Sequence, residues 1–220
     1  MKLIRLAAVL LAGSPILSSQ AFAADEVVVT QDEIASAIEI AFGAAVTTRY
    51  VSRGIAQSDG VALQGYVEAS YNIIYAGVWA STVDLDPDDV EIDFYAGIRP
   101  EFGALSLDIG YARYVYDSTG DCCGEIYGKA NYAFTDEFSG GVELYWDPEN
   151  DTTYGALVSE VALPYDFTLS GGIGTFFDDE YDWNIGISYT FEETITLDLR
   201  YHDHTDAPAR FVATLSFDSS

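Results

Sequence analysis

The sequence predicts an all-β fold, a transmembrane antiparallel β-barrel of about twelve strands with up-and-down connections. Three observations lead to this prediction. From residue 36 to the end, segments of about ten residues alternate between apolar and polar side chains, the length and period of strands that cross a membrane in a barrel. Short turns alternate with longer acidic connections between these segments, and one face of almost every segment carries no charged side chain.

The first 35 residues are expected to lie outside the barrel. Lys2 and Arg5 provide a positive start, residues 6–17 an apolar core, and residues 21–23 an Ala-Phe-Ala cleavage signal, so residues 1–23 are typical of a secretory signal peptide. Residues 24–35 form a polar periplasmic lead-in, either a loose tail or a small plug, before the barrel of residues 36–220. After residue 23 no apolar run approaches the length of a membrane-spanning helix, so only a barrel could cross a bilayer.

The connections set the strand number. Short turns are expected at residues 71–72, 100–103, 135–136, 164–165 and 192–193. Longer connections are centred on residues 53–60, 84–89, 118–124, 147–152, 177–183 and 203–209. Barrels of the outer-membrane type have short turns at the periplasmic end and longer loops at the other. Five short and six long connections join twelve strands, with the first strand starting on the side where the last one ends.

The two faces of the segments differ in charge, which orients each segment. Residues 38–46, 90–98, 105–111, 126–132, 142–146 and 195–202 each have one uncharged apolar parity and one parity with polar or charged side chains. A charge at mid-bilayer costs about 2 to 4 kcal/mol, so the uncharged parity is expected to face lipid. In residues 154–163 both parities are apolar except for Glu160, and Leu157, Val161 and Leu163 are assigned outward because Glu160 must point inward.

The polar parity predicts which residues line the interior. Both signs of charge occur there, and the basic members are expected to face the acidic ones in a constriction. A soluble barrel or sandwich is the alternative, but it would place its apolar face inside. Aromatic residues near segment ends are consistent with interfacial girdles. The predicted pore-lining residues are Arg49, Gln64, Glu68, Glu91, Asp93, Arg99, Asp108, Lys129, Glu143, Asp198 and Arg200.

The net charge excludes a nucleic-acid-binding protein, and the two cysteines raise the question of a disulfide. The formal charge of −27 becomes −29 when Lys2 and Arg5 are removed with the signal peptide, so attraction to nucleic-acid phosphates is excluded. The only cysteines are Cys122 and Cys123, expected in a loop. In an exported protein they would form a vicinal disulfide or remain as two thiols, and a structural loop cap is favoured over a redox role.

No catalytic, metal or cofactor site is expected. Residues 84–89 resemble the start of a calcium loop, but Asp89 stands where the tight turn needs glycine and Tyr95 where a bidentate Glu belongs. His202 and His204 supply only two nitrogen ligands for zinc or copper. The chain has no GxSxG sequence for a nucleophilic serine, and both histidines fall near a loop, so an enzyme is not expected.

Several sequence blocks resemble the TorF family of proposed porins, which are exported proteins of Gram-negative bacteria. The first block is Arg53-Gly54-Ile55-Ala56-Gln57-Ser58, followed by Leu63-Gln64-Gly65. Residues 75–81, which contain Trp79, and residues 91–97 and 107–111 are similar to the following blocks. The matching motif residues are Arg53, Gly54, Gln57, Gln64, Gly65 and Trp79.

This resemblance covers the chain from Phe42 to the end. It implies a pore in the outer membrane of a Gram-negative bacterium, with no established substrate. Three features depart from the family pattern. Arg49 stands where an Asp commonly precedes the Tyr, the Cys122-Cys123 pair is an addition, and the chain continues to Ser220 after Phe217 rather than ending on the aromatic residue.

These observations favour a transport function, a narrow passive porin channel for small polar or cationic solutes. Twelve strands lie between the filled eight-stranded barrel and the open sixteen-stranded one. The interior charges could instead pair and close the bore. The alternative function is a non-conducting barrel that acts as a surface binding or structural protein, whose acidic loops hold divalent cations. The expected partners are outer-membrane lipid and lipopolysaccharide, the barrel assembly machinery and small-molecule solutes, with no nucleic acid.

Overall fold

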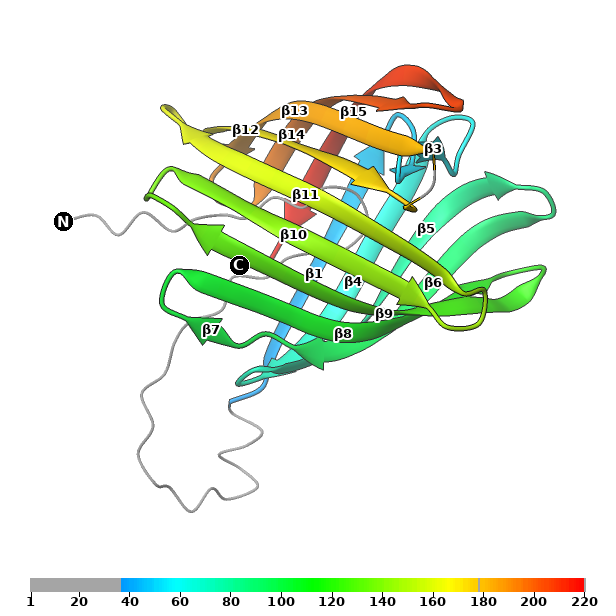
Figure 1. The fold of residues 1–220 in the computed structure, drawn as a ribbon, viewed down its shortest axis with the longest axis horizontal. Helices are drawn as coiled ribbons and strands as arrows, with labels where there is room; N and C mark the ends of the chain where they lie inside the picture. The colour runs from blue at the N-terminus through cyan, green and yellow to red at the C-terminus, as the bar shows by residue number, and fades with distance from the viewer. Residues whose placement is uncertain (1–36, 178, 220) are drawn as a thin grey trace, which may run out of the picture.

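The computed structural model describes residues 37–177 and 179–219 as strands joined by turns and loops (Figure 1). Three short strands accompany twelve long ones: β2 (Val51–Ser52), β3 (Ile55–Ala56) and β7 (Glu101–Phe102). The long strands are β1 (Glu39–Thr47), β4 (Ala62–Tyr71), β5 (Ile74–Leu85), β6 (Asp88–Ile98), β8 (Leu105–Tyr116), β9 (Gly120–Ala133), β10 (Phe138–Asp147), β11 (Thr152–Leu163), β12 (Phe167–Thr175), β13 (Tyr181–Phe191), β14 (Ile195–His204) and β15 (Ala207–Asp218).

The long strands close into a single barrel. Each pairs antiparallel with the next long strand along the chain, and β1 also pairs with β15 from Gly43 opposite Asp218 to Thr47 opposite Thr214. This is a closed, up-and-down, twelve-stranded antiparallel barrel, which confirms the predicted fold class and excludes a two-sheet sandwich. Within the described residues, no helix has the length and hydropathy needed to cross a membrane.

The long connections were predicted less well than the strands. The five short turns fall near the predicted positions, and the loop between β1 and β4 is long. Residues 84–89, 118–124 and 203–209, however, are mostly strand, because β6 begins at Asp88, β9 at Gly120 and β15 at Ala207. The prediction of long loops there is wrong.

The error has a physical reason. Backbone pairing continues through polar residues, so an acidic stretch does not by itself end a strand. Strands β5, β8, β11 and β15 have 12 residues and β9 has 14, more than the roughly 9 to 11 that cross a bilayer. The β5–β6 and β8–β9 hairpins accordingly project at the right of Figure 1.

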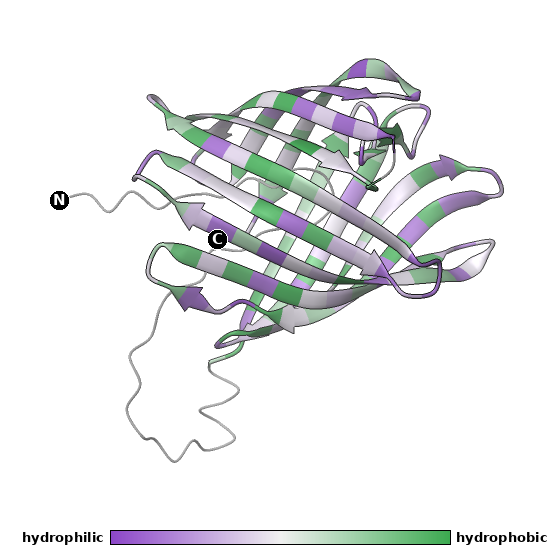
Figure 2. Cartoon of the chain, viewed as in Figure 1, coloured by the Kyte–Doolittle hydropathy of each residue, from purple (hydrophilic) through white to green (hydrophobic). Residues whose placement is uncertain are grey.

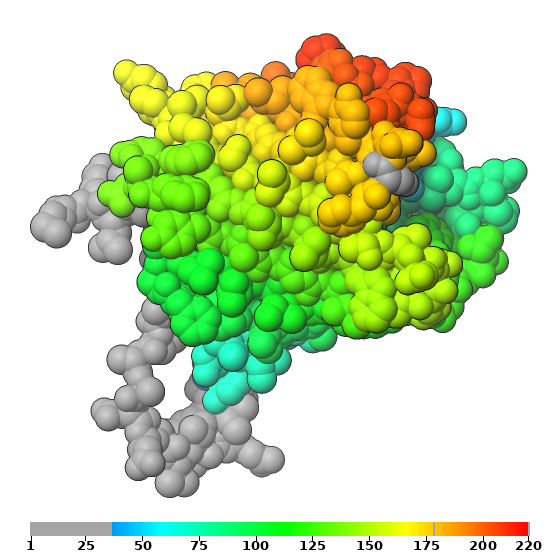
Figure 3. All heavy atoms as spheres, in the orientation of Figure 1, coloured from blue at the N-terminus to red at the C-terminus, as the bar shows by residue number. Residues whose placement is uncertain are grey.

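The outer face of the barrel is apolar and the inner face is polar. Phe94 and Leu144 are 51% and 52% exposed, whereas Glu68, Glu91 and Asp93 are 1%, 5% and 6% exposed. Bands of opposite hydropathy alternate along the strands in Figure 2. In Figure 3 the side chains of neighbouring strands pack into a continuous outer surface on the face turned to the viewer. The predicted outward parity is confirmed for residues such as Phe42, Phe94 and Leu144.

Inside the barrel, tyrosines on some strands lie over glycines on neighbouring ones. A Cβ at Gly97 would lie 2.5 Å from Tyr75 Oη, and a Cβ at Gly110 would lie 2.5 Å from Tyr127 Oη. The two hydroxyl oxygens are 2.6 Å apart. Glycine at these wall positions therefore makes room for aromatic side chains, which cover strand backbone that would otherwise be bare.

The predicted signal peptide (residues 1–23) lies outside the described residues, and so does the predicted lead-in (residues 24–35).

Candidate functional site

The loop between β1 and β4 folds back on itself as a short hairpin. Strands β2 and β3 pair Val51 with Ala56 and Ser52 with Ile55. At its base, the Tyr50 amide donates to Ser58 Oγ at 2.8 Å, and the Gln57 amide donates to the Tyr50 carbonyl at 2.8 Å. We call residues 50–58 the internal hairpin, because the contacts described next place its tip inside the barrel.

The end of β5 holds this hairpin in place. The Asp84 amide donates to the Gln57 carbonyl at 2.8 Å, and the Asp59 amide donates to Asp84 Oδ2 at 2.6 Å. On the other side of the base, the Tyr50 ring packs edge-on against Trp79, with the ring centroids 5.5 Å apart. The hairpin therefore has a fixed footing on β5.

Arg53 at the hairpin tip binds a strand far along the chain. Its Nη1 and Nη2 atoms donate to the two carboxylate oxygens of Glu125 on β9, both at 2.7 Å. Tyr114 Oη donates to Glu125 Oε2 at 2.7 Å. Burial by itself would lower the pKa of Arg53, but the hydrogen bonds and charge of Glu125 outweigh it and raise the pKa above its usual range. The guanidinium is therefore charged at any physiological pH.

Aromatic rings enclose the same guanidinium. Arg53 Cζ lies 4.8 Å from the ring centroid of Tyr145 on β10, 4.6 Å from that of Tyr154 on β11 and 5.6 Å from that of Phe176. A guanidinium over an aromatic face at such distances is attracted by the ring. A residue rooted between β1 and β4 thus contacts β9, β10 and β11, so the hairpin crosses the bore of the barrel.

Gly54 brings the tip against a third part of the wall. Its φ is +75°, and an added Cβ would lie 2.7 Å from Cβ of Asp182 on β13 and 2.9 Å from Cβ of His204 on β14. Glycine is needed for both reasons, the left-handed backbone and the close approach. The internal hairpin consequently touches the wall at β9–β11 and at β13–β14.

A pair of acidic residues faces the interior beside the hairpin. Glu91 and Asp93 lie two positions apart on β6, and both are buried. Glu91 Oε1 accepts a hydrogen bond from Tyr116 Oη at 3.2 Å. Within the described residues, Glu91 Oε2 and Asp93 Oδ1 have no hydrogen-bond partner. We call Glu91 and Asp93 the acid pair.

A fully bonded network lies closer to the short-turn end. Arg99 donates to the two carboxylate oxygens of Glu68 at 2.6 and 3.1 Å, and its Nε is 3.5 Å from Asp108 Oδ2. Its guanidinium carbon lies 3.6 Å from the Tyr75 ring centroid, and Tyr75 Oη donates to Asp108. These charges compensate one another inside the barrel.

Two further basic side chains also have partners. Arg200 on β14 donates to Asp198 Oδ2 at 2.9 Å, to Asn184 Oδ1 at 2.8 Å and to Ser170 Oγ at 2.8 Å. Lys129 Nζ lies 5.2 Å from the Tyr127 ring centroid and 5.6 Å from that of Tyr145. Tyr145 Oη in turn donates to Glu143 at 2.8 Å.

Between the hairpin and the walls lies a cavity of about 300 Å³. It is acidic, because six carboxylates and one arginine line it. Strands β11 and β12 line it with Thr152, Tyr154, Ala156, Val158, Gly172 and Ile173. The charged lining residues are Arg53, Glu91, Asp93, Glu125, Glu143, Asp147 and Asp182.

Ten of the eleven predicted pore-lining residues lie on a long strand or directly after one. Arg99 directly follows β6. The other nine lie on long strands, on the parity opposite the lipid-facing side chains: Gln64, Glu68, Glu91, Asp93, Asp108, Lys129, Glu143, Asp198 and Arg200. Arg49 differs, because β1 ends at Thr47 and Arg49 lies in the following loop, where it donates to the Asp59 carbonyl.

The predicted charge pairing is correct in part. Arg99 binds Glu68 and Arg200 binds Asp198. The acid pair, in contrast, has no ion pair with a basic side chain among the described residues. Gln64 bonds Ser81 Oγ at 3.4 Å.

The family-motif residues build the internal hairpin and its surroundings. Arg53, Gly54 and Gln57 belong to the hairpin and Trp79 supports its base, while an added Cβ at Gly65 would lie 3.2 Å from the Gly43 carbonyl. That this segment enters the barrel was not predicted, nor were its partners Glu125, Tyr114, Tyr145, Tyr154 and Asp182. One sequence signal was available for Glu125. Its position has the same parity as Lys129, which was predicted to face the interior.

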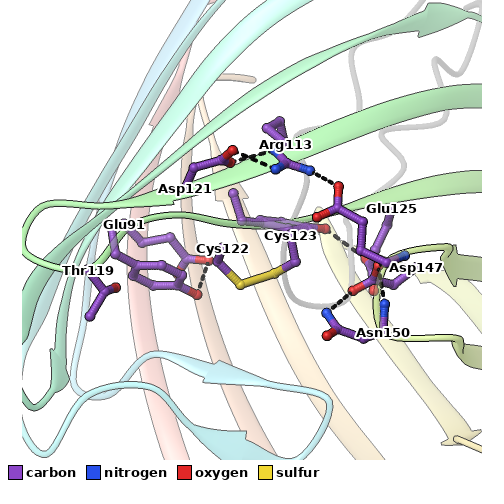
Figure 4. Close-up of a disulfide and its surroundings, with 12 residues drawn as sticks. Glu91, Arg113, Thr119, Asp121, Cys122, Cys123, Glu125, Asp147 and Asn150 are labelled. Carbon is purple, nitrogen blue, oxygen red and sulfur yellow. Dashed lines mark hydrogen bonds and ion pairs between the residues drawn. A yellow bond between two sulfur atoms is a disulfide. The ribbon is translucent and has the colours of Figure 1, made fainter.

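The two cysteines form a disulfide within a strand (Figure 4). The structure has the vicinal disulfide, one of the two predicted alternatives, and the predicted placement of the cysteines in a loop is wrong, because both lie in β9. The β8–β9 register pairs Tyr114 with Cys123 and Val115 with Asp121, so Cys122 is the extra residue of a β-bulge. Cys123 lines the cavity. Figure 4 also shows Arg113 bonded to Asp121.

Acidic residues at the loop end serve as hydrogen-bond acceptors for neighbouring loops. Asp88 accepts from the Ser118 and Thr119 amides at 3.0 and 2.8 Å, and Asp117 accepts from the Asp89 amide at 2.9 Å. Across residues 37–177 and 179–219, no group of three or more His, Cys, Asp or Glu side chains is arranged to hold a metal ion.

Residues 31–219 match the model of a bacterial protein family of unknown function, Gcw_chp. The chain belongs to this family. The match covers the whole barrel, including the internal hairpin, but it does not carry the TorF name. A search of curated proteins gives no match.

Solved structures similar to this chain are outer-membrane barrels. The KdgM porin has a TM-score of 0.63 at 10% identity, over 80% of this chain and 98% of the porin, and a second KdgM structure contains disordered oligogalacturonate. The NanC porin has a TM-score of 0.55 at 12% identity, over 81% and 98%. Outer-membrane phospholipase A from Escherichia coli has a TM-score of 0.50 at 10% identity, over 82% and 92%. At these identities the likeness shows the barrel fold alone.

Proposed function

We propose that the protein is an outer-membrane porin of a Gram-negative bacterium, a narrow passive channel for small polar or cationic solutes. The observation that carries this proposal is the internal hairpin, which crosses a polar bore and leaves an acidic cavity beside it. A barrel built only as an anchor has no need of an interior element held by a buried ion pair. The hairpin is the constriction of the channel in this proposal.

The outer face supports a membrane location. Rows of exposed apolar side chains such as Ile40, Phe94 and Leu144 cover the wall, and a barrel with such a face is stable in lipid because its backbone groups are all paired. The TorF resemblance, the signal peptide of residues 1–23, contact with lipopolysaccharide and assembly by the barrel machinery are parts of the same proposal.

The cavity supports the preference for cations. Six acidic side chains and one arginine line it, and a low-dielectric site with one sign of charge concentrates counter-ions. KdgM has been solved with oligogalacturonate, whose sugars each carry a carboxylate. The acidic cavity of this chain would repel such a solute, so we expect the two proteins to differ in the solutes they pass.

The alternative, a non-conducting surface protein with cation-bridging loops, has less support. Asp84, Asp88 and Asp117 accept hydrogen bonds from backbone amides of neighbouring loops, so they already stabilise the loop end. A catalytic role is not proposed. His202 and His204 are buried, whereas a lipase acting from the membrane needs its histidine and serine at the lipid-facing surface.

Single-channel recording tests the proposal. We expect refolded wild-type protein to conduct in planar bilayers, and a variant in which residues 51–57 are replaced by a short Gly-Ser linker to conduct several-fold more. Replacing the exposed turn residue Asp136 by Asn is the control, and its conductance should equal that of wild type. No conductance from folded wild type and folded linker variant would refute the channel.

A further inference from the structure

Within the described part of the chain, the acid pair has buried side-chain oxygens without hydrogen-bond partners, whereas the unpartnered atom of Arg210 is the donor Nη1. Glu91 and Asp93 are each more than nine-tenths buried, and both line the cavity. Glu91 Oε2 and Asp93 Oδ1 find no donor among the described residues. Glu68, equally buried, accepts two hydrogen bonds from Arg99. Buried acceptors without donors are rare in folded proteins and call for a partner.

Aromatic side chains frame the acid pair. In the strand register, Asp93 lies between Trp79 on β5 and Tyr114 on β8, and Glu91 lies opposite Tyr116. Tyr50, at the base of the internal hairpin, adds a further ring through its contact with Trp79. Carboxylates surrounded by aromatic faces suit an organic cation, which gains from both the charge and the rings.

Two arginines of the lumen, Arg53 and Arg99, are not available to neutralise the acid pair. Arg53 is committed to both oxygens of Glu125, and Arg99 is bonded to Glu68. A metal ion fits poorly, because the described residues contain no group of three His, Cys, Asp or Glu ligands. The unpartnered oxygens are hydrogen-bond acceptors, and among organic cations a primary ammonium can donate to them whereas a quaternary ammonium cannot.

We propose that Glu91 and Asp93 form a binding subsite for small primary alkylammonium cations. The inference rests on the proposed function for the way a solute reaches the lumen, and it names the class of solute. Residues two positions apart on one strand face lie about 7 Å apart, which is close to the spacing of the two amino groups in extended 1,4-diaminobutane. The cavity of about 300 Å³ lies at the lower end of the range for small-molecule sites.

Isothermal titration calorimetry of the refolded protein in detergent micelles tests the subsite, with 1,4-diaminobutane as the probe. We expect wild type to bind it and the double variant Glu91→Gln with Asp93→Asn to bind it at least about tenfold more weakly. The matched control removes two charges from exposed turns, Asp136→Asn with Asp166→Asn, and should bind like wild type. Circular dichroism and thermal unfolding establish that all three proteins are folded.

Tetramethylammonium is the second probe, and it should bind wild type at least about tenfold more weakly than the diamine, because it has no N–H group. Equal binding of the diamine by wild type and by the acid-pair variant would overturn the subsite. Equal binding of the two probes, or displacement of the diamine by stoichiometric Ca²⁺, would overturn the assignment to primary ammonium. A protein that binds but does not conduct would refute only the channel, and one that conducts without binding would refute only the subsite.

Discussion

Replacing Arg53 by Ala should release the internal hairpin from the barrel wall. The substitution removes two hydrogen bonds of 2.7 Å to Glu125 and the contacts with Tyr145 and Tyr154. The side chains of Arg53 and Glu125 are 24% and 9% exposed, so the pair is largely shielded from water. Removing one partner of a buried pair costs about 3 to 5 kcal/mol, because the remaining charge is left uncompensated.

Most of this free-energy cost should weaken the docking of the hairpin against the wall, because the backbone hydrogen bonds between the barrel strands stay intact. About 3 kcal/mol corresponds to a change of roughly a hundredfold in the docked-to-undocked ratio. We therefore expect backbone amides of residues 50–58 to exchange with solvent roughly a hundredfold faster in the variant. Single-channel recordings should show a larger mean conductance and more current noise.

A double-mutant cycle separates the pair from other effects. Glu125→Gln alone should also loosen the hairpin, and the double variant Arg53→Ala with Glu125→Gln should be less impaired than the sum of the single variants, because no uncompensated charge remains. Arg113→Ala, which removes the ion pairs of Arg113 with Asp121 and Glu149 on the outside of β8, is the control. Unchanged exchange and unchanged conductance in Arg53→Ala would refute the role of Arg53 as the tether of the hairpin.

Three further predictions concern the hairpin, the wall and the lumen. Gly54→Ala should displace the hairpin tip and raise conductance, as Arg53→Ala does, because the added Cβ would lie 2.7 Å from a β13 side chain and 2.9 Å from a β14 side chain; wild-type conductance would contradict this. Phe94→Arg should sharply reduce folded protein in outer-membrane fractions, since a lipid-facing charge costs about 2 to 4 kcal/mol, whereas Asp93→Arg should assemble; equal yields would argue against the membrane face. Neutralising Glu91 and Asp93 should lower cation selectivity, measured as the reversal potential across a salt gradient, more than neutralising Asp206 at the loop end, and selectivity should fall at high salt; anion preference in wild type would refute the lumen assignment.

Face orientation could be predicted from the sequence because it follows from a strict period of two, and strand number could be predicted because the turns between the periodic segments could be counted. Glu91 and Asp93 alternate with Ile92 and Phe94, and no other arrangement keeps both acids away from lipid. The same rule carries Lys129 and Glu143 to the interior. Strand ends were harder to predict, since a ladder continues through polar residues until a turn stops it. Cys122 shows this, as it lies in a β-bulge within β9.

The internal hairpin could not be predicted in this way, because a loop has no periodicity and its partners are far away along the chain. Arg53 and Glu125 are 72 residues apart. The block containing Arg53-Gly54 was recognised as a family motif, yet its role becomes clear only in three dimensions, where Gly54 allows the close approach and Arg53 provides the tether.

In the described part of the chain, some charged side chains of the lumen have hydrogen-bond and ion-pair partners and others do not, and this difference distinguishes structural residues from candidate binding residues. Glu68, Arg99 and Asp108 satisfy one another, so that network stabilises the barrel and requires no ligand. The acid pair has no comparable partners, because Glu91 Oε2 and Asp93 Oδ1 find no donor among the described residues. The position of Glu91 and Asp93 on the wall of the acidic cavity beside the hairpin fits the proposed binding of a cationic solute.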